Sequence, residues 1–169
     1  MKNEILYNKY KIFNNLNNDE IDFFIKKIST ERYKKNQVVI SEGDIGDSII
    51  FLLSGEISIT KALTLSISKS NNSNIVEKEF SRLTSEQYIS LGENSLFNQN
   101  NKRTATIKTL SECELGFLNN KDLFSICEKN YEVGYKLLKN LNEIITQNLI
   151  KTNHQILRLT TAFSLLVDE

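Results

Sequence analysis

A series of short apolar segments between residues 32 and 118 narrows the possible folds more than any other part of the sequence. Turn residues separate these segments, as in Glu42-Gly43-Asp44, Gly46-Asp47 and Ser54-Gly55-Glu56. We expect the glycines to supply positive φ angles there. Several short β-type segments at this spacing are typical of an antiparallel barrel or roll. The expected strands cover residues 38–40, 49–53, 57–59, 104–107 and 113–117.

The pattern is weaker between residues 60 and 88. A polar, low-complexity stretch at residues 69–74 is expected to form the tip of a hairpin. Residues 75–83 are then expected to return as a strand.

A helical segment is expected near the N-terminus, over residues 5–30. Asn17 followed by Glu20 has the character of a capping box, in which each side chain accepts from the backbone of the other. After this pair, apolar side chains recur at helical spacing. They are Ile21, Phe24, Ile25 and Ile28.

The apolar period becomes helical again from residue 121. We predict a short helix over 122–129 and a longer helix from 131 to about 154. One heptad-like stripe of the longer helix continues beyond that point, either to pack on its own barrel or to pair with a partner helix. The length of the stripe favours a partner, most simply a second copy of the chain. The stripe consists of Leu137, Leu141, Ile145, Asn148, Thr152, Ile156, Leu159, Phe163 and Leu166.

Together these patterns predict an α+β fold that is mainly β. It would be an antiparallel β-roll or jelly-roll barrel, flanked by an N-terminal helix and a long C-terminal helix. We divide the chain into an N-terminal helical segment (1–30), a β-roll (31–120) and C-terminal helices (121–169) to which we assign dimerisation.

The composition excludes some classes of function. Lys plus Arg and Asp plus Glu each number 21 among 169 residues, and this balance argues against DNA binding, which rests on neutralising phosphates. The sequence has no apolar run of signal-peptide or membrane-spanning length, so we expect a cytoplasmic protein. Cys113 and Cys127 are expected to be reduced, buried thiols. Only His154 could help them to bind a metal.

The segment richest in groups that could bind a ligand covers residues 91–107. Gly92 lets a backbone approach a ligand closely because it has no Cβ. Residues 93–97 could start a helical turn whose free N–H groups face an anion. Arg103 can form charge-assisted bonds with phosphate oxygens, and Glu93 can accept hydrogen bonds from a sugar hydroxyl. These groups suit a small cyclic phosphate ester.

The order of these features resembles that of the cyclic nucleotide-binding domain family. This family includes the sensor module of the bacterial cAMP receptor protein and the regulatory subunits of protein kinase A. The resemblance covers roughly residues 12–150. Its most specific parts are Glu42-Gly43-Asp44, Gly92-Glu93 and Arg103-Thr104-Ala105.

The resemblance implies a role for each residue of the family's phosphate-binding cassette. Glu93 would bind the ribose 2′-hydroxyl and Arg103 would pair with the cyclic phosphate. Gly92 would precede the acid as in the family, and the N–H of Ser95 would lie near the phosphate. Thr104 matches the small residue after the arginine, and it does not decide between cAMP and cGMP.

The sequence also departs from the family pattern. Asn94 occupies a position that is usually apolar, and residues 86–90 replace the Gly-Asp turn before the cassette. On the long helix, Asn148 is either a base-contacting residue or a polar heptad residue that fixes register. Without a ligand, Glu93 and Arg103 could pair with each other.

We therefore expect a stand-alone sensor domain that binds cAMP or cGMP and signals to an effector protein through its C-terminal helix. No winged helix-turn-helix fits after that helix, and no cofactor is expected. The alternative is a degenerate member of the fold that binds no nucleotide and acts as a protein-interaction module. We do not expect an enzyme, because no metal-ligand cluster or nucleophile–base pair is evident in the sequence.

Overall fold

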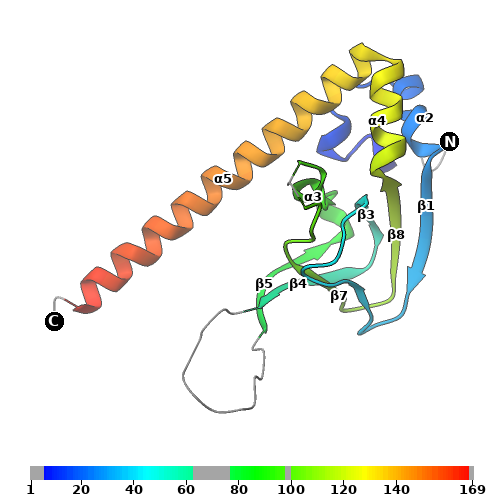
Figure 1. Ribbon diagram of the computed structural model, residues 1–169. Helices are drawn as coiled ribbons and strands as arrows, with labels where there is room; N and C mark the ends of the chain where they lie inside the picture. The colour runs from blue at the N-terminus through cyan, green and yellow to red at the C-terminus, as the bar shows by residue number, and fades with distance from the viewer. Residues whose placement is uncertain (1–5, 63–76, 98–99, 168–169) are drawn as a thin grey trace.

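The computed structural model describes residues 6–62, 77–97 and 100–167, which form two antiparallel sheets with helices beside them (Figure 1). One sheet has the order β1-β8-β3-β6 and the other the order β2-β7-β4-β5, which confirms the predicted roll. The strands are β1 (Ile28–Tyr33), β2 (Val38–Ile40), β3 (Ser48–Ser54), β4 (Glu56–Ala62), β5 (Glu77–Thr84), β6 (Ser90–Leu91), β7 (Thr106–Thr109) and β8 (Cys113–Asn119). The helices are η1 (Lys11–Phe13), α2 (Asn18–Ile25), η2 (Ser85–Gln87), α3 (Glu93–Phe97), α4 (Asn120–Lys129) and α5 (Tyr131–Val167).

Strand β3 lies between β8 and β6 in the first sheet and is buried on both faces. Successive side chains of a strand point to opposite faces of its sheet. Ile49 and Phe51 therefore join the core beneath the helices, whereas Ile50 and Leu52 join the core between the two sheets. Burial on both faces explains why this part of the sequence is a continuous apolar run rather than an alternating one.

The N-terminal segment fastens the helices to the first sheet. The hydroxyl of Tyr10 donates to the carbonyl of Leu52 at 2.7 Å, and its ring meets Phe51 edge-on. The predicted capping box of α2 is present, since Asn17 and Glu20 each accept a backbone N–H of the other at 2.9 and 2.8 Å. These contacts fix where α2 begins.

The first part of α5 is bound to the same N-terminal segment. The amide of Asn140 is buried and donates to the carbonyls of Ile12 and Asn14, at 3.0 and 2.6 Å. Lys136 forms an ion pair with Glu20 at 2.8 Å. Figure 1 shows that α5 then runs past α3 and extends beyond the roll.

The second part of α5 carries an exposed apolar stripe. Leu137 and Leu141 are buried, but the side chains of the stripe from Ile156 onward are exposed. The helix continues to Val167, past the predicted end near residue 154. Among the helices of the described ranges, none is long and apolar enough to cross a membrane.

Some element boundaries differ from the predictions. The N-terminal helical segment does not reach residue 30, because α2 ends at Ile25 and Ile28 opens β1 by pairing with Leu118 of β8. Pairing with a neighbouring strand outweighs the helical spacing of Ile28. Strand β7 begins at Thr106 rather than at residue 104. Strands β1 and β6 were not predicted.

The irregular region before the cassette is only partly described. The polar stretch at residues 69–74 lies outside the described residues. The strand expected over 75–83 corresponds to β5, which pairs with β4 from Glu77 to Thr84.

Candidate functional site

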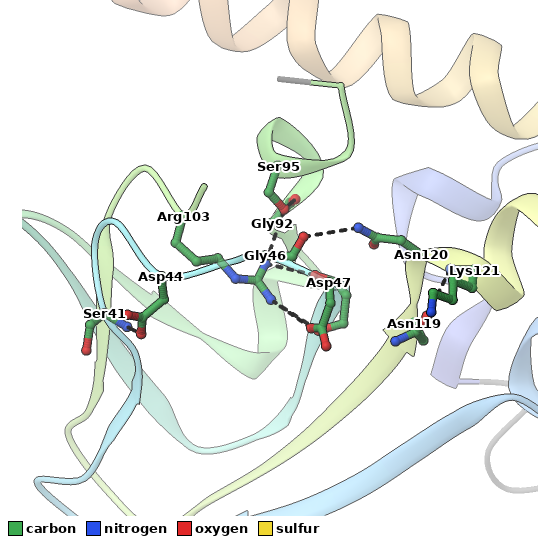
Figure 2. Close-up of polar contacts among 11 residues, drawn as sticks. Ser41, Asp44, Gly46, Asp47, Gly92, Ser95, Arg103, Asn119, Asn120 and Lys121 are labelled. Carbon is green, nitrogen blue, oxygen red and sulfur yellow. Dashed lines mark hydrogen bonds and ion pairs between the residues drawn. The ribbon is translucent and has the colours of Figure 1, made fainter. Parts of the chain in front are cut away.

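The guanidinium of Arg103 is buried beside the start of β3. The residue is only 5% exposed, and its Nη1 and Nη2 donate to the carbonyl and hydroxyl of Ser48 at 2.8 and 3.1 Å. Asp47 lies 3.9 Å from Nη2 and is itself largely exposed. Figure 2 shows the guanidinium directed at Asp47 and at the turn formed by Gly46. The guanidinium thus lies among groups of Ser48, Ser95 and Asp47.

The backbone of Arg103 is held by one turn from a distant part of the sequence. Its N–H donates to the carbonyl of Asp44 at 2.8 Å, and its carbonyl accepts from the N–H of Gly43 at 2.9 Å. Ile45 and Lys102 form an isolated antiparallel bridge beside them. The Glu42-Gly43-Asp44 turn therefore holds the backbone of Arg103 in position.

Glycine is required at two positions because the side chains of Arg103 and Ser95 pass so close. A Cβ on Gly92 would lie 2.5 Å from Nη1 of Arg103 and 2.9 Å from the carbonyl of Ser48. A Cβ on Gly46 would lie 2.5 Å from the hydroxyl of Ser95. Positive φ angles occur at Gly43, Gly55 and Gly92 but not at Gly46, so the expectation of positive φ is wrong there and space is the reason for glycine.

Glu93 is buried at the start of α3 without a partner for one of its carboxylate oxygens. It is 7% exposed, and Oε2 has no hydrogen-bond partner among the described residues. Burial raises the pKa of Glu93, and a bond from its own backbone N–H opposes that shift only in part. A buried acceptor in this state can gain a donor from a ligand.

Arg103 also has an unsatisfied atom. Its Nε is buried and has no hydrogen-bond partner in the part of the chain that the structure describes. Burial lowers the pKa of Arg103, while the carboxylates of Asp47 and Asp44 act in the opposite direction. Glu93 and Arg103 do not pair with each other, since the ion-pair partner of Arg103 is Asp47.

A pocket of about 140 Å³ lies between α5 and the chain segment that leads into the cassette. Glu93 and Asn148 both line it, so the structure brings these two predicted residues together. Arg103 does not line this pocket. The lining residues are Lys11, Gln87, Tyr88, Ile89, Ser90, Leu91, Glu93, Ile144, Gln147, Asn148 and Lys151.

The other predicted residues lie at the edges of the cassette. Ser95 is buried on α3, where its N–H and hydroxyl both donate to the carbonyl of Gly92, at 3.1 and 2.7 Å. Asn94 and Thr104 are exposed.

The sequence did not identify Ser48 or Tyr88 as parts of the site. Ser48 is 55 positions from Arg103, and only the pairing of β3 with its neighbours brings it near. Tyr88 lines the pocket from a left-handed backbone conformation with φ 49°. Such a φ is unusual for a residue with a side chain. The available signal in the sequence was the replacement of the family's Gly-Asp turn by residues 86–90.

A roll of two antiparallel sheets, closed by a long helix and holding a buried arginine beside a glycine–glutamate turn, defines a cyclic nucleotide-binding domain. Residues 30–130 match the family described as "Cyclic nucleotide-binding domain", and the chain belongs to this family. Its members are typically non-catalytic sensor or regulatory domains. No curated protein is significantly similar to the chain in sequence.

Solved structures with the same fold include bacterial proteins and a regulatory domain of PKA. The Thermus thermophilus catabolite activator protein aligns with a TM-score of 0.72 at 17% identity, over 89% of this chain and 63% of its own length. A cyclic nucleotide-binding domain from Methylobacillus flagellatus gives 0.73 at 20% identity, over 90% and 79%. The regulatory domain of Toxoplasma gondii PKA, in a co-crystal structure with cAMP, gives 0.61 at 21% identity, over 73% and 42%.

Proposed function

We propose that this chain is a cytoplasmic sensor domain that binds a cyclic mononucleotide, cAMP or cGMP, in the cassette. The observation that carries the proposal is a pair of unsatisfied buried atoms of opposite charge, Oε2 of Glu93 and Nε of Arg103. Buried polar atoms without partners are rare in folded proteins, and each one costs about 1–3 kcal/mol. A ligand with a hydroxyl and an anionic group would satisfy both.

Arg103 is the proposed phosphate ligand. Its ion pair with Asp47 spans 3.9 Å to a carboxylate that is 71% exposed, so this pair contributes little. Its other contacts, to Ser48 and the hydroxyl of Ser95, are to neutral oxygens. A phosphate would offer the buried guanidinium a stronger, charge-assisted partner.

Glu93 is the proposed ribose ligand, and Asn148 the proposed base contact. Both line the pocket of about 140 Å³ beneath α5. Pockets for small molecules usually exceed roughly 300 Å³, so a whole nucleotide needs more room than this pocket offers. Binding would therefore favour a different placement of α5 or α3, and this difference in affinity would drive the switch.

We further propose that α5 transmits the ligand state to a second copy of the chain and to an effector protein. The exposed apolar stripe of its second half supports this proposal, because such a surface is stabilised by pairing with a partner helix. The helix would thus connect the pocket, at Asn148, with the dimer interface further along.

A double-mutant cycle tests the nucleotide site. Isothermal titration would compare cAMP and cGMP with their 2′-deoxy analogues on the wild-type protein and on Glu93→Gln. We expect each single change to weaken binding by about tenfold, and the combination to weaken it little further, because both changes remove the same hydrogen bond. Additive losses would exclude the contact between Glu93 and the 2′-hydroxyl. Absence of binding by all four ligands would refute the proposed function.

The second candidate is a protein-interaction module that binds no nucleotide. The hydrogen bonds of Arg103 to Ser48 favour it, since they fill part of the cassette with the chain's own groups. In that case no cyclic nucleotide would bind, and Arg103→Ala would lower the thermal stability without affecting any titration.

A further inference from the structure

A second cleft, larger than the pocket beside Glu93, lies between the second half of α5 and the end of the β4–β5 ladder. Its volume is about 580 Å³. Lys61 and Lys78 line it from the two strands, and Arg158 lines it from α5. No residue assigned to the nucleotide lines this cleft, so the proposed nucleotide site does not account for it.

The two lysines of the cleft form a like-charge pair. In the register of the antiparallel ladder, Lys61 lies directly opposite Lys78. Both side chains therefore point to the same face of the sheet, where like charges in opposite positions repel each other and destabilise the pairing. Arg158 brings a third positive charge to the same cleft. An anion placed between these cations would relieve the repulsion.

The cleft carries more positive than negative charge. Glu79 is the only carboxylate among its described lining residues, and it already accepts a hydrogen bond from Nε of Arg82 at 2.6 Å. None of the three cations forms an ion pair with another described residue. The cleft is therefore complementary in charge to an acidic partner.

A β-bulge supplies the cleft with an exposed aromatic ring. The register of the ladder shifts between Ile59 and Thr60. Their partners are Ser81 and Glu79, so Phe80 between them has no residue opposite. Bulges of this kind change the direction of a side chain. Phe80 lines the cleft and is 70% exposed, so an occupant meets an apolar surface as well as positive charge.

The open form of the cleft favours a protein segment over a small molecule. The three cations and Phe80 are all exposed, whereas sites for small molecules bury most of the surface of their ligand. Clusters of basic side chains are a common way to recognise acidic peptide motifs. Addition of a strand to the edge of β5 is not favoured, because a bulge and charged side chains protect that edge.

We infer that this cleft binds an acidic segment of an effector protein, with carboxylates between the cations and an apolar side chain against Phe80. The inference rests on the proposed function in one respect, namely that α5 carries the ligand state to an effector. Arg158 is on α5 and the two lysines are on the sheet, so a movement of this helix would change the spacing of the three charges.

The test is a fluorescence-anisotropy titration of the protein with short synthetic peptides, made without nucleotide. The acidic probe is a labelled peptide in which glutamates flank two adjacent leucines. One control peptide has lysine in place of glutamate, and the other has serine in place of leucine. We expect saturable binding of the acidic leucine peptide alone. This binding should weaken as the salt concentration rises, because exposed charges are screened.

The double variant Lys61→Gln with Lys78→Gln tests the charges of the cleft. It should weaken binding of the acidic probe by about threefold to thirtyfold, because two exposed ion pairs are lost. The matched control is Lys35→Gln with Lys108→Gln, which makes the same change in net charge at two exposed lysines outside the cleft. This control should bind the probe as the wild-type protein does.

Phe80→Ala tests the apolar contact. It should weaken binding of the acidic probe by about tenfold, because the leucines lose a surface to bury against. The matched control is Tyr135→Ala, since Tyr135 is also 70% exposed and lies on the first half of α5, outside the cleft. This control should leave the affinity unchanged.

Four results would overturn the inference. They are absence of saturable binding of the acidic probe, equal effects of the cleft variants and their controls, equal binding of the serine peptide, and a lower mass of a cleft variant in sedimentation equilibrium. Equal binding of the serine peptide would show a general anion-binding patch, and a lower mass would assign the cleft to a second copy of the chain. Each result leaves nucleotide binding standing, which the titrations with cAMP and cGMP test separately.

Discussion

At the scale of single residues, the sequence suggests which residues form the cassette but not which partners hold them. Gly92, Glu93 and Arg103 lie within twelve positions, and their residue types already suggest a phosphate and a sugar. Ser48, which binds the guanidinium, comes from another strand 55 positions away. A contact of this kind depends on the strand order of the whole sheet, which no local pattern specifies.

Gly92→Ala is expected to damage the cassette through a steric clash. The new Cβ would meet Nη1 of Arg103 at 2.5 Å, in a backbone conformation with φ 92°. Gly43→Ala is a matched control, because Gly43 has φ 91° and a Cβ there would have no atom within 4 Å. Both variants should lose about 1 kcal/mol from the backbone strain. Gly92→Ala should lose about 1–3 kcal/mol more in urea denaturation. Equal losses would show that the clash is absent.

Glu93→Gln is expected to stabilise the ligand-free protein at neutral pH. Burial holds the folded-state pKa of Glu93 above its ordinary value of 4.5. The folded protein then binds more protons than the unfolded chain, so stability falls as the pH rises through this window and stays low above it.

Thermal melts from about pH 4 to pH 8 would test this linkage. The glutamine cannot ionise, so the variant should be more stable than the wild-type protein at pH 7, by on the order of 1–3 kcal/mol. The difference should vanish at the acidic end. A difference that is constant with pH would mean that Glu93 does not titrate in this range.

At the scale of the elements, the helices were predicted more securely than their ends. The capping box at Asn17 fixes the start of α2, because both partners are close in the sequence. The predicted end of the N-terminal helical segment was wrong because Ile28 fits both a helical spacing and a strand. Only its pairing with Leu118 decides between the two. The short strand β6 has two residues, too few for any period to be visible.

Asn140→Ala is expected to loosen α5 from the N-terminal segment. It would leave the carbonyls of Ile12 and Asn14 without this donor, and the loss of stability should be about 1–3 kcal/mol. Asn142→Ala on the exposed face of the same helix is the control, with an expected effect within about 0.5 kcal/mol. Equal effects in urea denaturation would mean that the Asn140 amide does not hold the two segments together.

At the scale of the whole molecule, the apolar core of the roll is covered, but the apolar stripe on the second half of α5 is exposed. The heptad-like stripe was visible in the sequence, and the structure places Ile156, Leu159 and Phe163 at 56%, 71% and 68% exposure. The sequence could not decide what covers this stripe, because self-packing and dimerisation use the same apolar spacing. The exposure of these side chains favours the second interpretation.

Phe163→Glu is therefore expected to convert a dimer into a monomer. A charge on the apolar stripe would be buried without a partner if two α5 helices paired there. Thr161→Glu introduces the same charge two positions away, off the stripe, and should leave the mass unchanged. Sedimentation equilibrium would give the masses of the wild-type protein and both variants. A wild-type protein that is already monomeric at all concentrations would contradict dimerisation.

The whole account depends on Arg103 holding a cyclic phosphate. The most direct measurement is isothermal titration of cAMP and cGMP into the wild-type protein and into Arg103→Ala, with Arg32→Ala on the exposed face of β1 as the control. A charge-assisted bond contributes about 1.5–3 kcal/mol, so the account predicts saturable binding of at least one nucleotide that weakens by about tenfold to a hundredfold in Arg103→Ala alone. Binding that is absent in the wild-type protein, or unchanged in a folded Arg103→Ala variant, would contradict it.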